Sequence, residues 1–180
     1  MTDIRATLDS LLARRVLVLD GAMGTMVQRH SLTDADYRGA RFADHGHDLK
    51  GDTDVLVLTQ PDIVAGIHDA YLAAGADLIE TNTFGATAVA QGDYGLEAHV
   101  YEMNVEGARI AKRVAAAWTA KTPHQPRFVA GAIGPTNKVL SISPDVNNPA
   151  LRSITFEALR DAFKEQARGL VDGGADVILV

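Results

Sequence analysis

The sequence predicts a parallel α/β fold. Its expected strands are apolar throughout rather than alternating, as in parallel strands that are covered by helices. Helical patterns separate these strands, and strands that alternate with helices indicate a parallel sheet. One corner also occurs twice, as LAAGADLIE at 72–80 and LVDGGADVILV at 170–180. In each copy glycine ends a helix and Ala-Asp leads into a strand.

Two architectures fit this pattern, an open doubly wound sheet and part of an eight-stranded (β/α)8 TIM barrel. A barrel has eight strands and typically takes ~250 residues, so the four strands expected in these 180 residues are about half of one. The last apolar run ends the sequence without a following helix. We therefore expect the N-terminal half of a barrel, with four strands at Val16–Leu19, Leu78–Thr83, Phe128–Ile133 and Asp176–Val180.

Helices are expected before and between these strands. The first spans Thr2–Arg15, has its apolar residues on one stripe, and can be capped by Thr2 or Asp3. The second begins at Pro61 and stops at Gly75. Two more are expected at Ala98–Thr119 and Phe156–Val171. Residues 28–58 carry many Asp, Arg, His and Gly residues, and we expect a long, mostly irregular excursion there.

Composition narrows the functional class. The formal net charge of −6 argues against nucleic acid as a partner, because phosphate binding needs a basic surface. No apolar run approaches the roughly 20 residues needed to span a bilayer, and charges interrupt the first 15 residues, so we expect no membrane segment and no signal peptide. A cytoplasmic protein is expected. The absence of cysteine removes disulfides and thiolate metal ligands from this chain.

Candidate site residues follow the expected strands. Ligands of parallel α/β proteins bind at the carboxyl ends of strands. Three of these ends become polar or glycine-rich where the apolar run stops, at 20–25, 80–85 and 131–137. We therefore expect one binding site along this edge of the sheet.

The stretch LDGAMGT at 19–25 has three possible interpretations. A phosphate cradle is disfavoured, because G-x-x-G is not the dinucleotide pattern, no P-loop lysine follows, and Asp20 would repel an anion. A tight turn with an acidic cap is the simplest interpretation of so short a pattern. The third is a carboxylate, Asp20, that pairs with a cationic group such as a substrate ammonium.

The stretch ETNTFGAT at 80–87 is the second candidate. On a strand, Glu80 and Asn82 share one face with Leu78, and Ile79 shares the other with Thr81 and Thr83. Glu80 and Asn82 should point into a barrel mouth if Ile79 packs under helices. Alternatively, the Thr and Asn side chains only satisfy backbone groups at the end of the sheet.

Histidines give weaker signals. His45 and His47 have the spacing of a metal pair, but no third ligand is obvious nearby in the sequence, and a solvated loop is expected. His68 lies beside Asp69 and is therefore expected at the surface or edge of its helix.

Four segments together resemble a known family. They are LDGAMGTMVQ, ADYRGARFADHGHDLKGDTDVLVLTQP, AGADLIETNTFGAT and GAIGPTNKVLSISPDVNNP. In this order and spacing they resemble the homocysteine-binding domain at the N-terminus of cobalamin-dependent methionine synthases, in the homocysteine S-methyltransferase family. The resemblance covers essentially the whole chain, 1–180. The long excursion and the SISPDVNNP loop resemble this branch more than the betaine-dependent one.

The resemblance implies a (β/α)8 barrel in which zinc, held by three cysteines, binds homocysteine as a thiolate. The methyl group comes from methylcobalamin and is recharged by methyltetrahydrofolate on other modules. It implies no catalytic residue and no metal ligand in this chain. The residues that match the substrate-binding positions are Asp20, Gly21, Thr81, Asn82, Thr83, Gly134 and Pro135.

The departures from the family are also informative. The chain has no cysteine, so the ligands for zinc, like those for cobalamin, are expected outside it. The cobalamin, folate and reactivation modules that would be its partners are absent from the sequence. We expect the 180 residues to supply part of a homocysteine pocket and to be inactive alone. Two alternatives remain open, a methyltransferase that uses betaine or S-methylmethionine, and a non-catalytic binding module.

Overall fold

A computed structural model describes residues 3–180. It contains a three-stranded parallel sheet, with β1 (Leu78–Glu80), β2 (Phe128–Ala132) and β3 (Val177–Leu179) side by side in chain order. Leu19 extends the same order through a parallel bridge to Leu78. The predicted parallel α/β fold is confirmed.

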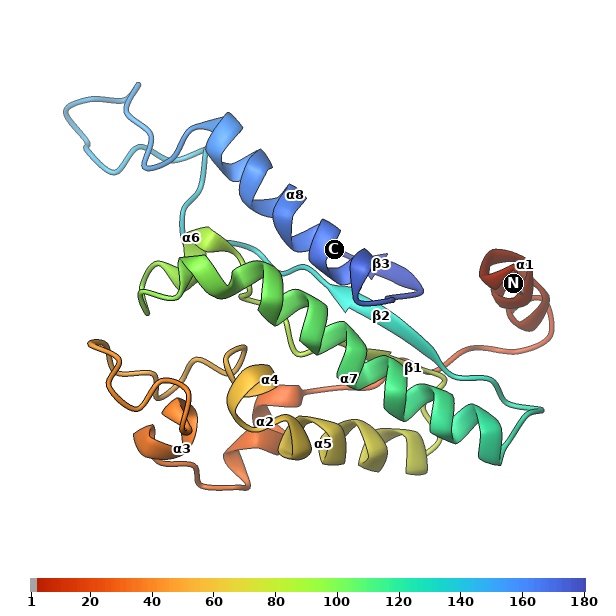
Figure 1. Cartoon of the computed structure of the whole chain (residues 1–180). Coiled ribbons are helices and arrows are strands. Elements are labelled where there is room, and N and C mark those ends of the chain that lie inside the picture. Colours follow the sequence, from red (N-terminus) through yellow and green to blue (C-terminus); the bar gives the residue numbers. More distant parts are fainter. Residues whose placement is uncertain (1–2) are drawn as a thin grey trace.

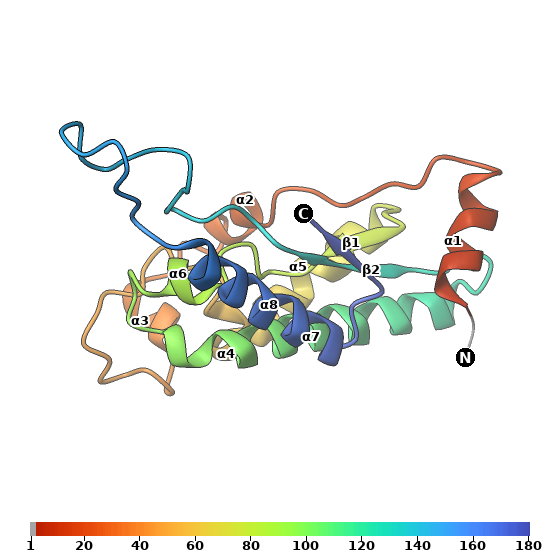
Figure 2. The same cartoon turned by 90° about the horizontal axis from the view of Figure 1, so that it is seen from above.

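Three long helices cover one face of this sheet. They are α5 (Pro61–Ala73), α7 (Val100–Lys121) and α8 (Phe156–Asp172), and they pack against one another in chain order (Figures 1 and 2). A doubly wound sheet has helices on both faces and reverses its strand order. The observed arrangement lacks both features within residues 3–180, and it is compatible with part of a barrel.

The expected helices form close to their predicted bounds. Asp3 caps α1 (Ile4–Leu12) by accepting a hydrogen bond from Ala6 N, whereas Thr2 lies outside the described residues. Pro61 opens α5, and Gly75 follows it with a φ of +106°, in the left-handed region that glycine tolerates. A 3-10 turn at Glu97–His99 leads into α7.

The first predicted strand is wrong. The segment 16–19 makes only the single bridge at Leu19, and Val16 and Val18 are 83% and 52% exposed. Only one edge of this segment is paired, and no part of residues 3–180 covers its other side. Other strands are shorter than predicted. The second ends at Glu80 instead of Thr83, and the last spans only Val177–Leu179, with Val180 96% exposed.

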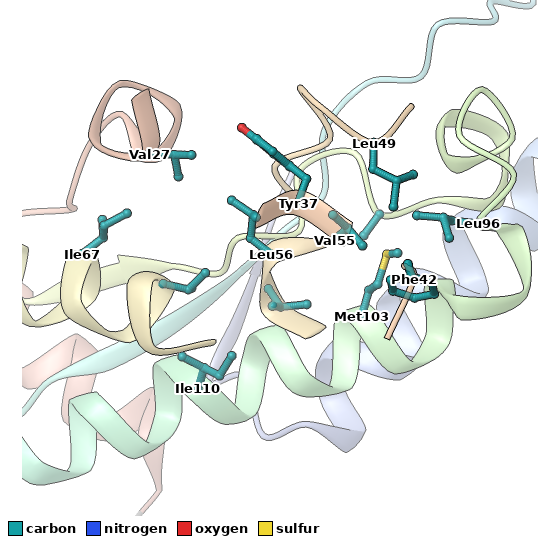
Figure 3. Close-up of a cluster of buried hydrophobic side chains, with 13 residues drawn as sticks. Val27, Tyr37, Phe42, Leu49, Val55, Leu56, Ile67, Leu96, Met103 and Ile110 are labelled. Carbon is teal, nitrogen blue, oxygen red and sulfur yellow. The ribbon is translucent and has the colours of Figure 1, made fainter. Parts of the chain in front are cut away.

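The excursion at 28–58 is more ordered than predicted. It is mostly irregular, as expected, but it contains α3 (Asp34–Arg38) and α4 (Leu56–Thr59), and α2 (Met23–Gln28) precedes it. Its apolar residues pack on α5 and α7 in a core cluster (Figure 3). From the excursion this cluster includes Tyr37, Phe42, Leu49, Val55, Leu56 and Val57.

A second core cluster lies between the sheet and α5 and α7. Ile79 of β1 is fully buried in it, together with Val129 of β2. This places Ile79 under the helices, as the strand alternation predicts. Glu80, the next residue, therefore belongs to the opposite face, where the candidate site lies.

The prediction for His68 is wrong. This residue is fully buried on α5, four residues from both Val64 and Leu72, which are buried on the same face. Its neighbour Asp69, which suggested an edge position, lies on the exposed side and accepts a hydrogen bond from Trp118.

Candidate functional site

A cavity of about 360 Å³ lies at the carboxyl ends of the strands. The turn after Leu19, the end of β1 and the end of β2 form its walls. Its lining residues are Asp20, Gly21, Ala22, Met23, Gly24, Thr53, Glu80, Thr81, Asn82, Phe84 and Ala132. The cavity therefore lies where ligands of parallel α/β proteins bind.

Backbone pairing places Asp20 in this cavity. Asp20 N donates to Leu78 O at 3.0 Å, next to the Leu19 bridge, and this brings Asp20 beside Glu80. One carboxylate oxygen of Asp20 then accepts a hydrogen bond from Glu80 N at 2.9 Å. The strand pairing thus orients Asp20 across the end of β1.

The two carboxyl groups in the cavity lack a cationic partner. Burial raises the pKa of Asp20 to about 7; the hydrogen bond from Glu80 N opposes this rise, and the negative charge of Glu80 adds to it. Burial also raises the pKa of Glu80. Within residues 3–180, no Lys, Arg or His lies within ion-pair distance of either group. Such a site favours a ligand that carries a positive charge.

The turn after Asp20 is open backbone. A side chain at Gly21 would make only ordinary contact with the Tyr71 hydroxyl, at 3.8 Å, so packing does not require glycine there. Tyr71 instead donates a hydrogen bond to Ala22 O and ties the turn to α5. The helix that follows, α2, has only six residues and no side-chain cap.

The hydroxyls of Thr81 and Thr83 tie β1 to β2. Thr83 Oγ1 donates to Ala132 O, and Thr81 Oγ1 accepts from Ala132 N, both at 2.9 Å. The two hydroxyls lie 2.6 Å apart, and Thr83 has already used its proton, so Thr81 donates to Thr83. These bonds favour a supporting role for both threonines. Thr81 lines the cavity, whereas Thr83 is fully buried behind it.

Asn82 connects the cavity wall to the excursion. Its side-chain amide donates to Thr53 O at 2.6 Å, and both residues line the cavity. Sequence reasoning missed Thr53, because nothing in the local pattern GDTD shows that the excursion folds back onto the end of β1. It also did not select Phe84 or Ala132, which line the cavity beside predicted residues.

Gly134 and Pro135 lie outside this cavity. They line a separate apolar cavity of about 540 Å³ next to α8 and β3. Gly134 N donates to Phe84 O at 3.0 Å, and a Cβ on Gly134 would lie 2.6 Å from Phe84. Only glycine allows this close approach, so Gly134 supports the Phe84 side of the first cavity. The structure thus brings four of the seven predicted residues, Asp20, Gly21, Thr81 and Asn82, to one cavity.

The residues present do not form a zinc site. Across residues 3–180, no three His, Cys, Asp or Glu side chains are grouped so that they could hold a metal ion, and the sequence has no cysteine. His45 donates a hydrogen bond from Nε2 to Tyr94 O at 2.7 Å, while His47 is exposed. Arg38 binds the backbone carbonyls of both histidines and fixes their loop.

The fold is that of a parallel α/β protein with a cavity at the carboxyl ends of its strands. A family model, described as homocysteine S-methyltransferase, matches residues 17–180. The chain therefore belongs to the homocysteine S-methyltransferase family. None of the helices in residues 3–180 is both long enough and apolar enough to cross a membrane.

Solved structures of the homocysteine methyltransferase MmuM from Escherichia coli have a similar fold. The oxidized form matches with a TM-score of 0.69 and 23% identity, over 99% of this chain and 56% of that chain. The metallated form matches with a TM-score of 0.70 and 23% identity, over 95% of this chain and 55% of that chain. The present chain thus spans about half the length of these structures.

Proposed function

We propose that this chain is the N-terminal half of the homocysteine-binding barrel of a methyltransferase that forms methionine. In this proposal residues 1–180 are the first part of a longer protein, the intact protein. The chain supplies part of the homocysteine pocket. The family match over residues 17–180 supports the reaction class, and the cavity supports the location of the substrate.

The observation that carries the proposal is the unpaired carboxyl group of Asp20. The Asp20 carboxyl is half-buried and pairs with no cation within residues 3–180. The ammonium group of an amino-acid substrate can supply this cation. Binding of the ammonium would favour the ionised form of Asp20 and lower its pKa. In the proposed pose, the open backbone at Gly21 and the Asn82 side chain lie around the same end of the substrate.

The chemistry at sulfur needs groups that these residues do not supply. A free thiol has a pKa near 8.5, and metal coordination deprotonates it outright. A relative is solved in a metallated form, which supports a metal-dependent reaction. Because the residues of this chain do not fit a zinc site, we assign zinc to other residues of the intact protein.

For the methyl donor we propose methylcobalamin, recharged by 5-methyltetrahydrofolate on further modules of a cytoplasmic protein. The proposal rests on the resemblance of the excursion and of the SISPDVNNP loop to the cobalamin-dependent branch. Betaine or S-methylmethionine as donor is the alternative, and a non-catalytic binding module is the second.

One assay separates these possibilities. The intact protein is incubated with homocysteine and, in parallel, with methylcobalamin, betaine or S-methylmethionine, and methionine is measured. We expect methionine from methylcobalamin and none above background from the other two donors. Methionine from betaine or S-methylmethionine alone contradicts the donor assignment. Homocysteine binding without methionine from any donor supports the non-catalytic module.

A further inference from the structure

Two buried aspartates lie directly behind the cavity wall. Asp52 is 2% exposed and Asp54 is 7% exposed, and they flank Thr53, which lines the cavity. Neither aspartate lines the cavity. Burial raises the pKa of Asp52, and it raises that of Asp54 to about 7, with the charge of Asp52 adding to the rise. Buried acids without a cation cost stability, so their presence needs a reason.

Hydrogen bonds from this pair hold a segment that is distant in sequence. One oxygen of Asp54 accepts from Gly85 N at 2.9 Å. Gln91 Nε2 donates to Asp52 at 3.1 Å and to Gly85 O at 3.3 Å. Asp54 therefore fixes the backbone N–H of Gly85. Gln91, which also binds Asp52, fixes the backbone carbonyl of Gly85.

Local capping explains only part of this arrangement. Asp52 accepts from Asp54 N at 3.2 Å, as an aspartate does in a turn that precedes a helix. Asp54 instead directs its carboxylate to Gly85, and a Cβ on Gly85 would lie 3.0 Å from Asp54 Oδ2. The excursion and the end of β1 are thus packed closely at this point. Asn82 adds a third connection by donating to Thr53 O.

We propose that Asp52 and Asp54 are positioning residues for the cavity. They clamp residues 82–85 to residues 52–54, which sets the relative places of Thr53, Asn82 and Phe84 in the cavity wall. Substrate affinity therefore depends on two side chains that do not touch the substrate. This inference rests on the proposed function for the identity of the substrate, but the clamp itself does not.

The test compares Asp54→Ala, Asp54→Asn and Asp176→Ala in the intact protein. The Ala variant removes the acceptor for Gly85 N, whereas the Asn variant keeps an acceptor of the same shape. Asp176 is a matched control, because it is a buried acid at the opposite, amino end of the sheet. Two quantities are measured, the Kd for homocysteine by titration calorimetry and the amide hydrogen exchange of residues 82–85.

We expect Asp54→Ala to raise the Kd about tenfold, as the loss of one buried hydrogen bond does, and to speed exchange at residues 82–85. Asp54→Asn should restore both values, and Asp176→Ala should change neither. Unchanged exchange in Asp54→Ala overturns the clamp, and faster exchange with an unchanged Kd overturns its role in binding. If the wild type does not bind homocysteine while exchange responds as expected, the proposed function fails and the clamp stands. If Asp54→Ala does not fold, the same two quantities are measured in Gln91→Met.

Discussion

Buried carboxyl groups in this chain differ in whether a cation pairs with them. Asp77, at the amino end of β1, binds Arg15 through two contacts of 2.7 Å. Asp20 and Asp54 lie beside the carboxyl ends of the strands, and within residues 3–180 no cation pairs with either. Burial raises the pKa of both groups to about 7. Within residues 3–180, a cation thus pairs with the buried carboxyl group at the amino end of β1, whereas no cation pairs with Asp20 or Asp54 near the cavity.

Residues that line the cavity could be predicted from the sequence only where they closely follow a strand. Asp20 and Asn82 reach the cavity because each follows an apolar run closely. Thr53 could not be predicted, because its place depends on how the excursion folds back. His68 was misplaced because its neighbour Asp69 suggested an edge, whereas the spacing from Val64 indicates the buried face.

His68→Leu should stabilise the protein. Both ring nitrogens of His68 are buried and have no hydrogen-bond partner within residues 3–180, and burial lowers the pKa of His68 to about 4. The unfolded chain, with a pKa near 6.5, takes up a proton that the folded state excludes, so His68 lowers stability as pH falls from about 6.5 to about 4. We expect the variant to gain about 1 kcal/mol at pH 7 and more at pH 5.

Denaturation of the intact protein at pH 7 and pH 5 measures this effect, with exposed His124→Leu as the control. If His68→Leu is less stable than the wild type at both pH values, the His68 ring makes a stabilising polar interaction that is not seen in the structure.

At the scale of elements, the repeated Ala-Asp corner has a physical cause. Asp77 accepts from Val18 N at 2.9 Å, and Asp176 accepts from Val129 N at 2.9 Å. Each aspartate therefore binds the start of the preceding strand segment, and each also pairs with a cation, Arg15 or Lys112. The sequence repeat predicted the corner itself. The two cross-strand bonds could not be predicted, because they join residues 59 and 47 positions apart.

Asp77→Asn should remove a pH-dependent part of the stability. Burial raises the pKa of Asp77, but hydrogen bonds from Arg15, Val18 N and Gln125 outweigh it and bring the pKa to about 2. Because the unfolded pKa is near 3.9, this stability is present above pH 4 and is lost as pH falls toward 2. Arg15 is partly exposed, so we expect a loss of only about 1–2 kcal/mol at neutral pH.

Urea unfolding of the intact protein at pH 7 and pH 2.5 checks this, with the exposed Asp62→Asn as the control. The difference in the free energy of unfolding between wild type and Asp77→Asn should be smaller at the lower pH. If this difference is the same at both pH values, the ion pair is not its cause.

For the whole molecule, the sheet leaves apolar side chains uncovered at both edges. Val16 and Val18 are exposed at one edge, and Ile178 and Val180 at the other. Exposed strand edges promote association. Parallel order and helix packing were predicted from the sequence because local patterns determine them, whereas coverage at the edges depends on what lies beyond each edge.

The 180-residue polypeptide, produced alone, should therefore self-associate or fold only partly. Analytical ultracentrifugation and binding of a hydrophobic dye measure these properties. A monomer with one sharp, cooperative unfolding transition is inconsistent with this expectation.

The same polypeptide should lack a tight zinc site. Without thiolates, only scattered histidines and carboxylates are available, and within residues 3–180 no three of them are grouped to hold a metal. Competition with a chelator should show no stoichiometric binding. Nanomolar zinc affinity would contradict the assignment of the metal to other residues.

The proposed homocysteine pocket depends most on the pairing of Asp20 with the substrate ammonium, and homocysteine affinity in the intact protein tests this pairing most directly. An ammonium–carboxylate hydrogen bond contributes roughly 1.5–3 kcal/mol, so Asp20→Asn should raise the Kd about ten- to a hundredfold at pH 8. Because the pKa of Asp20 is about 7, wild-type affinity should fall as pH drops below 7, and the variant should lose this part of the pH dependence. Zinc content should not change. A variant that binds homocysteine as tightly as the wild type across this pH range would show that Asp20 only closes a turn.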